Sequence, residues 1–524
     1  MNRFFPRLVL PFLVFLLAAC ASAPIAFGPV EALKTDTGYY ADHHIDFDDE
    51  TLMIVTFSGG GIRAATLAQG VLEALDTVPH EDGTLLDEID MISSTSGGSV
   101  AAANYVLHGR SGFPRFREDF LYQDHMTGLI AETVLNPPLP WSMMVENNRV
   151  EPSVRMFETL VTNGATFGDI RPDAPFWIAN ATDIESGLTF PFTQYQFDIL
   201  CADLDGFPIA RAVAASSAFP AAVSSIVVRN DAPCPAQRDE AGELNRNLIY
   251  IEDLQWTESP LRGGDGAAEV ERALVASDIM TACDEDVPCR RPAYVHLYDG
   301  GIADNLGLGE PLWLLTGAVA PWNRKMRNYT TAVGPDGKLI LRTVAVAAVN
   351  AASSKPSNIG QTARSPTMLT SVLGFMSSVI DRRSIGLTAQ LDALPNILAN
   401  EQCDEECQIR GEALSATVTA LSFKQIVDPV CRAQASALGT NWGLERHETD
   451  AVLNLGAALA FQSRPFRKVA GLTDGHPANV QWDEAARCHL AAACTCLADP
   501  EACLPAKIRF QAQCDGEQDR MTRR

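Results

Sequence analysis

Positive charge is scarce in this sequence. Lysine and arginine together number 40 against 65 aspartate and glutamate residues, which gives the 524-residue chain a formal net charge of −25. A surface this acidic repels phosphate backbones, so nucleic-acid binding is disfavoured, and so is docking onto anionic lipid by charge alone. Hydrophobic residues make up 47% and charged residues 20% of the chain, which excludes a disordered or coiled-coil protein.

Long apolar segments are also lacking. The run Leu8–Leu17 is too short to cross a bilayer, which needs about twenty apolar residues, and no later segment is long enough. Arg3 and Arg7 precede this run, and a short apolar run behind positive charge is typical of a signal peptide. The sequence therefore predicts an exported protein whose body lies outside the bilayer.

The apolar run ends in Leu-Ala-Ala-Cys at Cys20, which resembles the lipobox of bacterial lipoprotein signals. The resemblance implies that residues 1–19 are removed and that a lipid on Cys20 anchors the chain in the bacterial envelope. Ala21 is not the aspartate that would resemble an inner-membrane retention signal, so we expect the outer membrane. The alternative is ordinary secretory cleavage in the small-residue stretch Ala21–Ala23. Residues 20–48 have no periodic apolar pattern and are predicted to be a tether.

Thirteen cysteines are present, and twelve remain when Cys20 is set aside. In an exported chain they predict disulfide bonds, whose connectivity the sequence leaves open. A zinc site is the rival, but Cys494 and Cys496 lack the two-residue gap that is typical of zinc knuckles. The closely spaced cysteines are Cys283 with Cys289, Cys403 with Cys407, and the C-terminal cluster of Cys488, Cys494, Cys496, Cys503 and Cys514.

Short buried-strand patterns alternate with helical patterns over residues 49–465. This alternation predicts an α/β domain with a mostly parallel sheet. Residues 466–524 are cysteine-rich without a clear strand pattern, and they are predicted to form a disulfide-linked, largely helical appendage. The predicted strands are 52–57, 89–93, 176–180 and 344–349, and the predicted helices are 62–75 and 100–107.

Residues 126–148 form an apolar stretch that is broken by prolines. The pattern favours a packed loop with helical ends. The alternative is a flap over an apolar pocket, or a surface that touches lipid.

The first of three chemically suggestive turns is Ser-Gly-Gly-Gly-Ile-Arg, residues 58–63, between a predicted strand and a helix. Three glycines let the backbone adopt positive φ and leave N–H groups facing outward, which suits a phosphate or a developing oxyanion. A nucleotide loop would continue with Gly-Lys-Ser/Thr or a further spaced glycine, and neither follows. Arg63 by default caps the helix or forms a salt bridge.

The second turn is Ser-Thr-Ser-Gly-Gly, residues 94–98, which also joins a strand to a helix. It resembles the Gly-x-Ser-x-Gly nucleophile elbow, with Ser94 in place of the first glycine. An elbow needs small neighbours, because its tight turn brings other backbone close to the serine. The alternative is an ordinary serine-rich turn.

The third turn is Asp299-Gly300-Gly301, directly after a short apolar run. It suits either a hairpin or a carboxylate held in place as a general base. Histidine is scarce near the turns: His296 is expected in the core, and His108 lies at the far end of the predicted helix. A Ser-His-Asp triad therefore has no evident histidine, whereas a Ser-Asp dyad has both partners.

The three turns in this order resemble the patatin-like phospholipase family. The resemblance covers residues 49–350 and extends more loosely to residue 465. Between the turns lie secondary matches: Asn180–Asp183, Phe192–Thr193 and the Ala-Ser-Ser-Ala-Phe-Pro segment at 215–220.

The resemblance implies a three-layer α/β/α fold and hydrolysis of lipid acyl esters without a metal or other cofactor. It matches Ser96 to the nucleophile and Asp299 to the dyad base. Gly59, Gly60 and Gly61 match the oxyanion loop, with Arg63 as its usual companion. The alternatives are an acyltransferase with the same dyad and a catalytically silent lipid-binding lipoprotein of the envelope.

Overall fold

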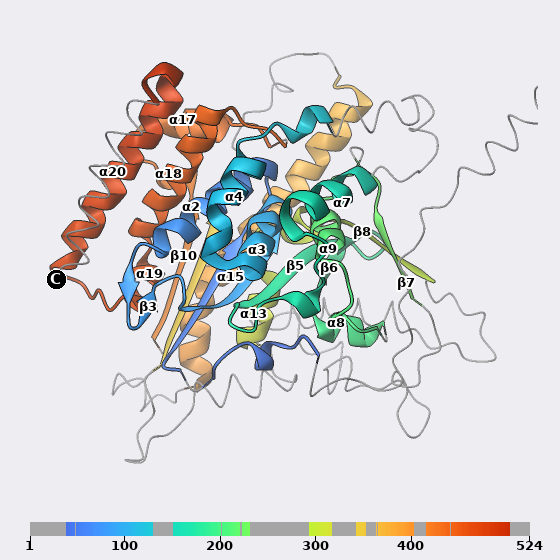
Figure 1. Ribbon diagram of the computed structural model, residues 1–524, viewed down its shortest axis with the longest axis horizontal. Coiled ribbons are helices and arrows are strands. Elements are labelled where there is room, and N and C mark those ends of the chain that lie inside the picture. Colours follow the sequence, from blue (N-terminus) through green and yellow to red (C-terminus); the bar gives the residue numbers. More distant parts are fainter. Residues whose placement is uncertain are drawn as a thin grey trace, which may run out of the picture.

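The structure is a computed structural model of the chain, shown in Figure 1. It describes residues 38–47, 49–128, 150–200, 202–220, 223–230, 293–316, 342–352, 363, 365–402, 415–440 and 442–503. The predicted signal peptide, Cys20 and the prolines of the 126–148 stretch lie outside these residues. Within the described helices, none combines the length and the hydropathy that a membrane crossing requires.

A mixed sheet with a parallel half forms the centre of the molecule (Figure 1). Five neighbouring strands run parallel. The next strand runs antiparallel to them, and the edge strand beyond it pairs antiparallel with that one, so the sheet is mixed and mostly parallel, which confirms the predicted α/β class. In spatial order the strands are β10 (Ser415–Ser422), β9 (Thr343–Asn350), β1 (Thr51–Phe57), β4 (Ile89–Thr95), β5 (Phe176–Asp183), β8 (Tyr294–Asp299) and β7 (Ile226–Arg229), while β6 (Leu188–Pro191) pairs with β5.

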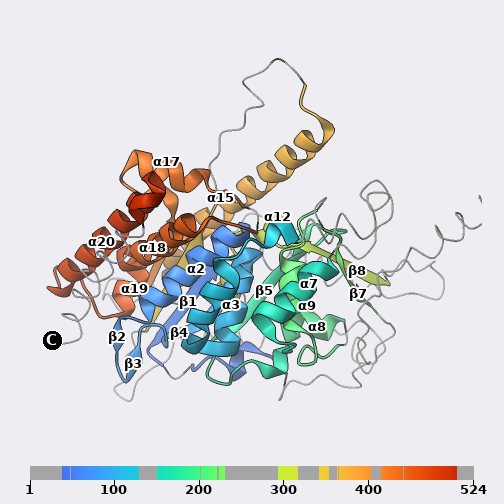
Figure 2. The same ribbon diagram turned by 45° about the horizontal axis from the view of Figure 1, so that its top comes forward.

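Helices cover both faces of the sheet, which confirms the three-layer fold. The crossover β1–α2–β4 advances along the sheet in one direction, and β9–α15–β10 advances in the other. Because parallel crossovers are right-handed, the helices of these two units lie on opposite faces (Figures 1 and 2). The helices on one face are α2 (Gly61–Leu75), α3 (Gly97–His108), α9 (Ile209–Ser216), α18 (Arg446–Gln462) and α19 (Arg464–Val469). The opposite face carries α15 (Met368–Gln402), which contacts α12 (Gly301–Asp304) and α13 (Gly309–Thr316).

The remaining described elements are short, except for α20 at the C-terminal end. They are η1 (Ala41–His43), β2 (Pro79–His80), β3 (Gly83–Thr84), η2 (Gly109–Gly112), α4 (Phe113–Phe116), η3 (Arg117–Leu121), α7 (Glu151–Phe157), η4 (Glu158–Thr162), η5 (Phe167–Asp169), α8 (Gln194–Ile199), η8 (Phe423–Gln425), α17 (Pro429–Ala437) and α20 (Ala478–Ala498).

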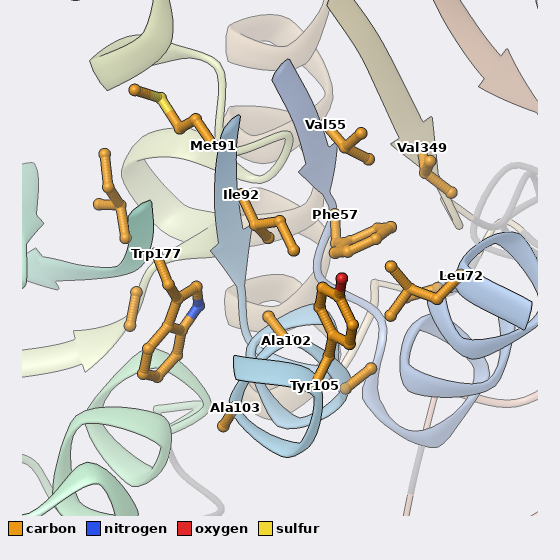
Figure 3. Packing of buried hydrophobic residues seen from close by; sticks show 14 of the residues in the cluster. Val55, Phe57, Leu72, Met91, Ile92, Ala102, Ala103, Tyr105, Trp177 and Val349 are labelled. Carbon is orange, nitrogen blue, oxygen red and sulfur yellow. The ribbon is translucent and has the colours of Figure 1, made fainter. Parts of the chain in front are cut away.

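The central strands are apolar on both faces because both faces are covered. On one face, Phe57 and Ile92 pack toward α3, where Ala102 and Ala103 let the helix approach the sheet closely (Figure 3). Burial of such side chains is worth roughly 25 cal/mol per Å² of apolar surface, and it holds the strand ends in a fixed register. The positions of the three turns follow from this core.

The folded body begins before residue 49. Tyr39 and Tyr40 are buried in the main core. The Tyr39 hydroxyl donates to the Trp177 carbonyl (3.1 Å), and the Tyr40 hydroxyl donates to Asp198 Oδ2 (2.7 Å). The tether predicted for residues 20–48 is therefore too long, because two aromatic side chains without a periodic pattern gave no signal of burial.

The C-terminal region is helical and contains disulfide-bonded cysteines, as predicted, and it packs against the main domain. The predicted boundary at residue 465 falls inside α19, and Phe466 is fully buried in the main core. Helix α20 packs on α18, and α18 packs on α2 through glycine: a Cβ on Gly70 would collide with the Leu453 carbonyl, and a Cβ on Gly456 would lie 2.5 Å from the Leu67 carbonyl oxygen.

Two disulfide bonds have both of their cysteines among the described residues of this region, and Cys488 is disulfide-bonded as well. Cys431 in α17 is bonded to Cys494 in α20, and Cys496 is bonded to Cys503. Cys494 and Cys496 therefore have different disulfide partners, which supports the disulfide interpretation over a zinc knuckle. The predicted cysteine pairs at 283 and 289, and at 403 and 407, and Cys514 lie outside the described residues.

Candidate active site

The three turns meet at one edge of the sheet. Strands β1 and β4 are parallel neighbours, so the turns that follow them lie side by side at their carboxyl ends. The antiparallel strand β8 brings its last residue, Asp299, opposite Ala181 of β5. Thr95, directly before Ser96, pairs with Asn180, so Ser96 and Asp299 reach the same level.

Ser96 occupies the tip of a strained strand-to-helix turn. Its φ of 52° and ψ of −124° lie in a region that non-glycine residues rarely adopt. Its backbone N–H donates to Ser216 Oγ (2.8 Å), and its side-chain hydroxyl donates to Asp299 Oδ2 (3.0 Å). Such strain persists where the surroundings over-determine the conformation, and it is typical of catalytic turns.

The glycines after Ser96 permit the close approach of the neighbouring turn. A Cβ on Gly97 would collide with the backbone of Gly61, and a Cβ on Gly98 would lie 2.6 Å from the Phe57 carbonyl oxygen. Both positions need glycine because of the backbone of β1 and its turn. The two glycine-rich sequences are thus parts of one packed unit.

Ser94, which replaces the usual glycine of the elbow, has its own hydrogen bonds. Its hydroxyl accepts from Trp177 Nε1 (2.8 Å) and lies 3.0 Å from Ser99 Oγ and 3.2 Å from the Ile178 carbonyl. The side chain is completely buried. Serine in place of the usual glycine leaves the turn intact, because its buried hydroxyl has hydrogen-bond partners at this position.

Ser216 is a positioning residue whose role was not evident in the sequence. It accepts the N–H of Ser96, donates to the Asn180 carbonyl (2.6 Å) and contacts Ser99 Oγ (2.9 Å). Its backbone carbonyl also accepts the N–H of Gly300 (3.0 Å). One sign of this residue was present in the sequence: Ser216 lies in the Ala-Ser-Ser-Ala-Phe-Pro segment, which is part of the family resemblance but to which no function was assigned.

Asp299 is buried, and burial raises the pKa of its carboxyl group to about 6. Two hydrogen bonds oppose this effect, from the N–H of Gly301 to Oδ1 (2.8 Å) and from Ser96 to Oδ2. Its backbone is fixed by Thr182, whose hydroxyl donates to the Asp299 carbonyl (2.9 Å). The carboxylate is therefore rigidly held and more basic than an exposed aspartate.

The glycine turn after β1 divides its N–H groups between two roles. The N–H of Gly59 donates to the Asn305 carbonyl (2.9 Å), so it is unavailable to a substrate. Gly60 and Gly61 have positive φ (140° and 59°), and no acceptor for their N–H groups lies among the described residues. As first residues of a helix they have no partner within it. Of the three glycines of the predicted oxyanion loop, Gly60 and Gly61 therefore have N–H groups without an acceptor in the described chain, and Gly59 does not.

Comparison with known families agrees with this geometry. A family model described as patatin-like phospholipase matches residues 55–312. Residues 55–312 form a patatin-like phospholipase domain. The match includes all three turns of the patatin-like site and ends before α15, β9 and β10. A search among curated proteins found no match. This domain supports lipid acyl hydrolysis as the general class of activity.

Arg63 is buried beside the patatin-like glycine turn. Its Nη2 lies 3.4 Å from the position that a Cβ on Gly60 would occupy, and its Nη1 donates to the Leu438 carbonyl (2.6 Å). Burial lowers the pKa of the guanidinium to about 10, and no ion pair of Arg63 occurs within the described ranges. Leu438 is the residue that follows α17, so this hydrogen bond caps the C-terminal end of that helix, in agreement with the expectation of a structural cap.

Histidine takes no part in the contacts of Ser96 or Asp299 within the described chain. His108 Nε2 lies 2.8 Å from the Val161 carbonyl. His296, expected in the core, is exposed instead, because β8 alternates and places it on the outer face beside Ser225. The prediction for His296 was wrong because a single strand-like run does not show which face is covered.

Proposed function

We propose that the protein is a serine lipid acyl hydrolase of the phospholipase A or lysophospholipase type, with Ser96 as nucleophile and Asp299 as general base. The observation that carries the proposal is the 3.0 Å hydrogen bond from Ser96 Oγ to Asp299 Oδ2 at the tip of a strained turn. The patatin-like domain supports the ester class, and the geometry supports the assignment of the dyad.

In the acylation step, Asp299 accepts the hydroxyl proton as Ser96 Oγ attacks the ester carbonyl carbon. The carbonyl oxygen becomes an oxyanion, which the N–H groups of Gly60 and Gly61 stabilise. Loss of one such donor costs about 3–4 kcal/mol in comparable enzymes. The proton on Asp299 then passes to the leaving alcohol oxygen, and the acyl group stays on Ser96.

In the deacylation step, Asp299 accepts a proton from water, whose oxygen attacks the acyl carbon. The fatty acid leaves, and the proton returns to Ser96 Oγ. The buried charge of Arg63 beside Gly60 adds positive potential where the oxyanion forms. The raised pKa of Asp299 suits this cycle, because a base near pKa 6 is ionised at neutral pH and still accepts a proton readily.

The test is labelling with a fluorophosphonate, which reacts with an activated serine. The wild type, Ser96→Ala and Asp299→Asn are compared, with thermal unfolding as the check that each is folded. We expect labelling of the wild type, none of Ser96→Ala, and strongly slowed labelling of Asp299→Asn. Undiminished labelling of a folded Ser96→Ala protein would overturn the assignment.

We further propose that the mature chain is anchored in the bacterial envelope by a lipid on Cys20. The support is the lipobox-like sequence, together with the disulfide bonds Cys431–Cys494 and Cys496–Cys503, which suit an oxidising compartment. Metabolic labelling with a fatty acid tests it. The wild type should incorporate label and Cys20→Ser should not, and equal labelling would refute the anchor.

A further inference from the structure

Helix α15 has two halves with opposite surroundings. In its C-terminal half Leu387, Leu391, Leu394 and Leu398 repeat at helical spacing and are buried. In its N-terminal half Phe375 is 71% exposed. The same helix therefore changes from a core element into one whose apolar side chains face solvent.

The topology explains this change. Helix α15 returns antiparallel between the parallel strands β9 and β10, so its N-terminus lies at the carboxyl edge of the sheet. Thirty-five helical residues span about 52 Å, whereas an eight-residue strand spans about 26 Å. The helix therefore extends beyond the edge where the candidate active site lies, and Figure 2 shows it rising away from the rest of the described chain.

Exposed apolar side chains gather at this edge. We call five of them the carboxyl-edge patch: Phe375, Val379 and Ile385 on α15, and Val427 and Val430 just after β10. Among the described residues, eight large hydrophobic side chains are exposed, and the patch holds five of them. Single exposed apolar side chains are ordinary on a soluble surface, but Phe375 and Val379 lie one turn apart on the same face of α15, and an exposed apolar helix face favours an interaction site.

The patch is connected to the candidate active site. Helix α15 contacts α12, the short helix that begins two residues after Asp299. At this contact Arg383 Nε donates to the Ala303 carbonyl (3.1 Å). Whatever covers the patch is therefore brought to the edge at which Ser96 and Asp299 lie.

Charge identifies the partner. The run 365–380 contains no charged residue, although one residue in five of the whole chain is charged. A helical segment without charge brings no ionised group into the headgroup region, and its exposed Phe375 and Val379 supply apolar surface for that contact. The acidity of the chain disfavours an anionic bilayer, which leaves a surface of zwitterionic headgroups.

We propose that the carboxyl-edge patch docks onto a zwitterionic lipid surface, with the N-terminal half of α15 lying in the interface, and so presents the active-site edge to its substrate. The inference rests on the proposed lipid acyl hydrolase function and specifies where that enzyme meets its lipid. Docking by this patch is separate from any anchor at Cys20.

The experiment measures flotation of the full chain with phosphatidylcholine vesicles, in a Cys20→Ala background that lacks the anchoring cysteine. The variant Phe375→Asp with Val379→Asp is compared with Val480→Asp, whose valine is 59% exposed on α20, outside the patch. We expect the double variant to lose about tenfold or more of its vesicle binding, because acidic groups enter the interface poorly, and the control to bind as the parent does.

Two activities separate this inference from the proposed function. The double variant should hydrolyse vesicle phospholipid about tenfold more slowly or worse, while its hydrolysis of a soluble short-chain ester is unchanged. If Ser96→Ala alone loses both reactions, that result tests the proposed dyad. It does not change what flotation shows about docking. Equal flotation of the double variant and its parent would overturn docking by the patch.

A second variant guards against misfolding. Phe375→Trp keeps the apolar character and adds a fluorophore, whose excess emission over the parent should be quenched by brominated phosphatidylcholine. Absence of quenching would contradict the proposal. A second outcome would also contradict it: the parent sediments as a dimer, the double variant sediments as a monomer, and the two bind vesicles equally. The patch would then join two copies of the chain.

Discussion

The two neighbouring turns of the site, at the ends of β4 and β1, differ in what they do with their polar groups. In the β4 turn, the N–H of Ser96 is bonded to Ser216 and the hydroxyl of Ser94 is bonded to Trp177. In the β1 turn, Gly60 and Gly61 keep N–H groups without an acceptor among the described residues. The β4 turn is held by several hydrogen bonds and carries the proposed nucleophile, whereas the β1 turn keeps N–H groups that suit the proposed oxyanion. The difference shows that a residue in a strained conformation needs hydrogen bonds to hold it there. Backbone N–H groups that are to bind a ligand must instead have no acceptor of their own nearby.

The largest effect should come from removing the nucleophile of the supported turn. Ser96→Ala and Ser96→Gly should each lower the rate of ester hydrolysis by about 10⁴-fold or more, as measured by steady-state turnover. Their stabilities should differ, because glycine adopts the φ of 52° without strain. We expect the free energy of unfolding of Ser96→Gly to exceed that of Ser96→Ala by about 1 kcal/mol in urea denaturation. Equal stability would show that the turn is relaxed.

The next effect concerns the contact between the two turns. Gly97→Ala places a methyl group against the backbone of Gly61 and should lower the free energy of unfolding by about 3 kcal/mol or more. The matched control is Gly206→Ala, because no atom lies within 4 Å of its added methyl group. Denaturant titration of both variants measures the difference. Similar values for the two would contradict the close packing of the turns.

The third effect concerns the buried base. Because the pKa of Asp299 is raised from 3.8 to about 6, the folded state disfavours its ionisation, and the cost reaches about 2–3 kcal/mol above pH 7 and vanishes below the unfolded pKa. Asp299→Asn should therefore be more stable than wild type at pH 8 and gain nothing at pH 3.5, in thermal unfolding. In the wild type, kcat/KM should fall as the pH drops through about 6. A pH-independent difference in stability would exclude a raised pKa.

The smallest effect should come from restoring the usual glycine of the elbow. Ser94→Gly leaves Trp177 Nε1 without its acceptor and should cost about 1–2 kcal/mol of stability. Turnover should change by less than about tenfold, since Ser216 still holds the N–H of Ser96. Calorimetry and turnover measured together test this separation. A loss of activity as large as that of Ser96→Ala would mean that Ser94 acts in the reaction.

Much of the fold near the site could be predicted from the sequence, for a physical reason. Strand β1 and the first half of β4 carry buried apolar residues, and a single serine separates each strand from a run of glycines, so their ends were predicted within two residues. Strand β10, Ser-Ala-Thr-Val-Thr-Ala-Leu-Ser, lies at the sheet edge and mixes polar and apolar residues, so it gave no clear signal. Helix α15 was missed because a buried apolar stripe occurs only in its C-terminal half, while Phe375, Val379 and Ile385 face solvent.

The candidate dyad could be predicted because each partner sits in a turn that needs glycine. The support around it could not, since it depends on contacts between distant segments. Ser216 reaches Ser96 from α9, and the Gly59 N–H is satisfied by Asn305, which follows α12. No local pattern reveals such pairs. The burial of Tyr39 and Tyr40 was missed for the same reason.

The pairing of β1 with β9 also affects the order in which the chain folds as it is synthesised. Thr51 lies opposite Thr343, so a strand near the beginning of the chain acquires its neighbour only after most of the chain has been made. Contacts between residues so far apart make folding slow, because a long loop must close before any pairing energy is gained. During this interval β1 can pair with β4 only, so its other edge stays open, a state that favours aggregation unless a chaperone holds it. The strand that leads to the first glycine-rich turn is thus among the last parts of the molecule to be completed, although it is among the first to be synthesised.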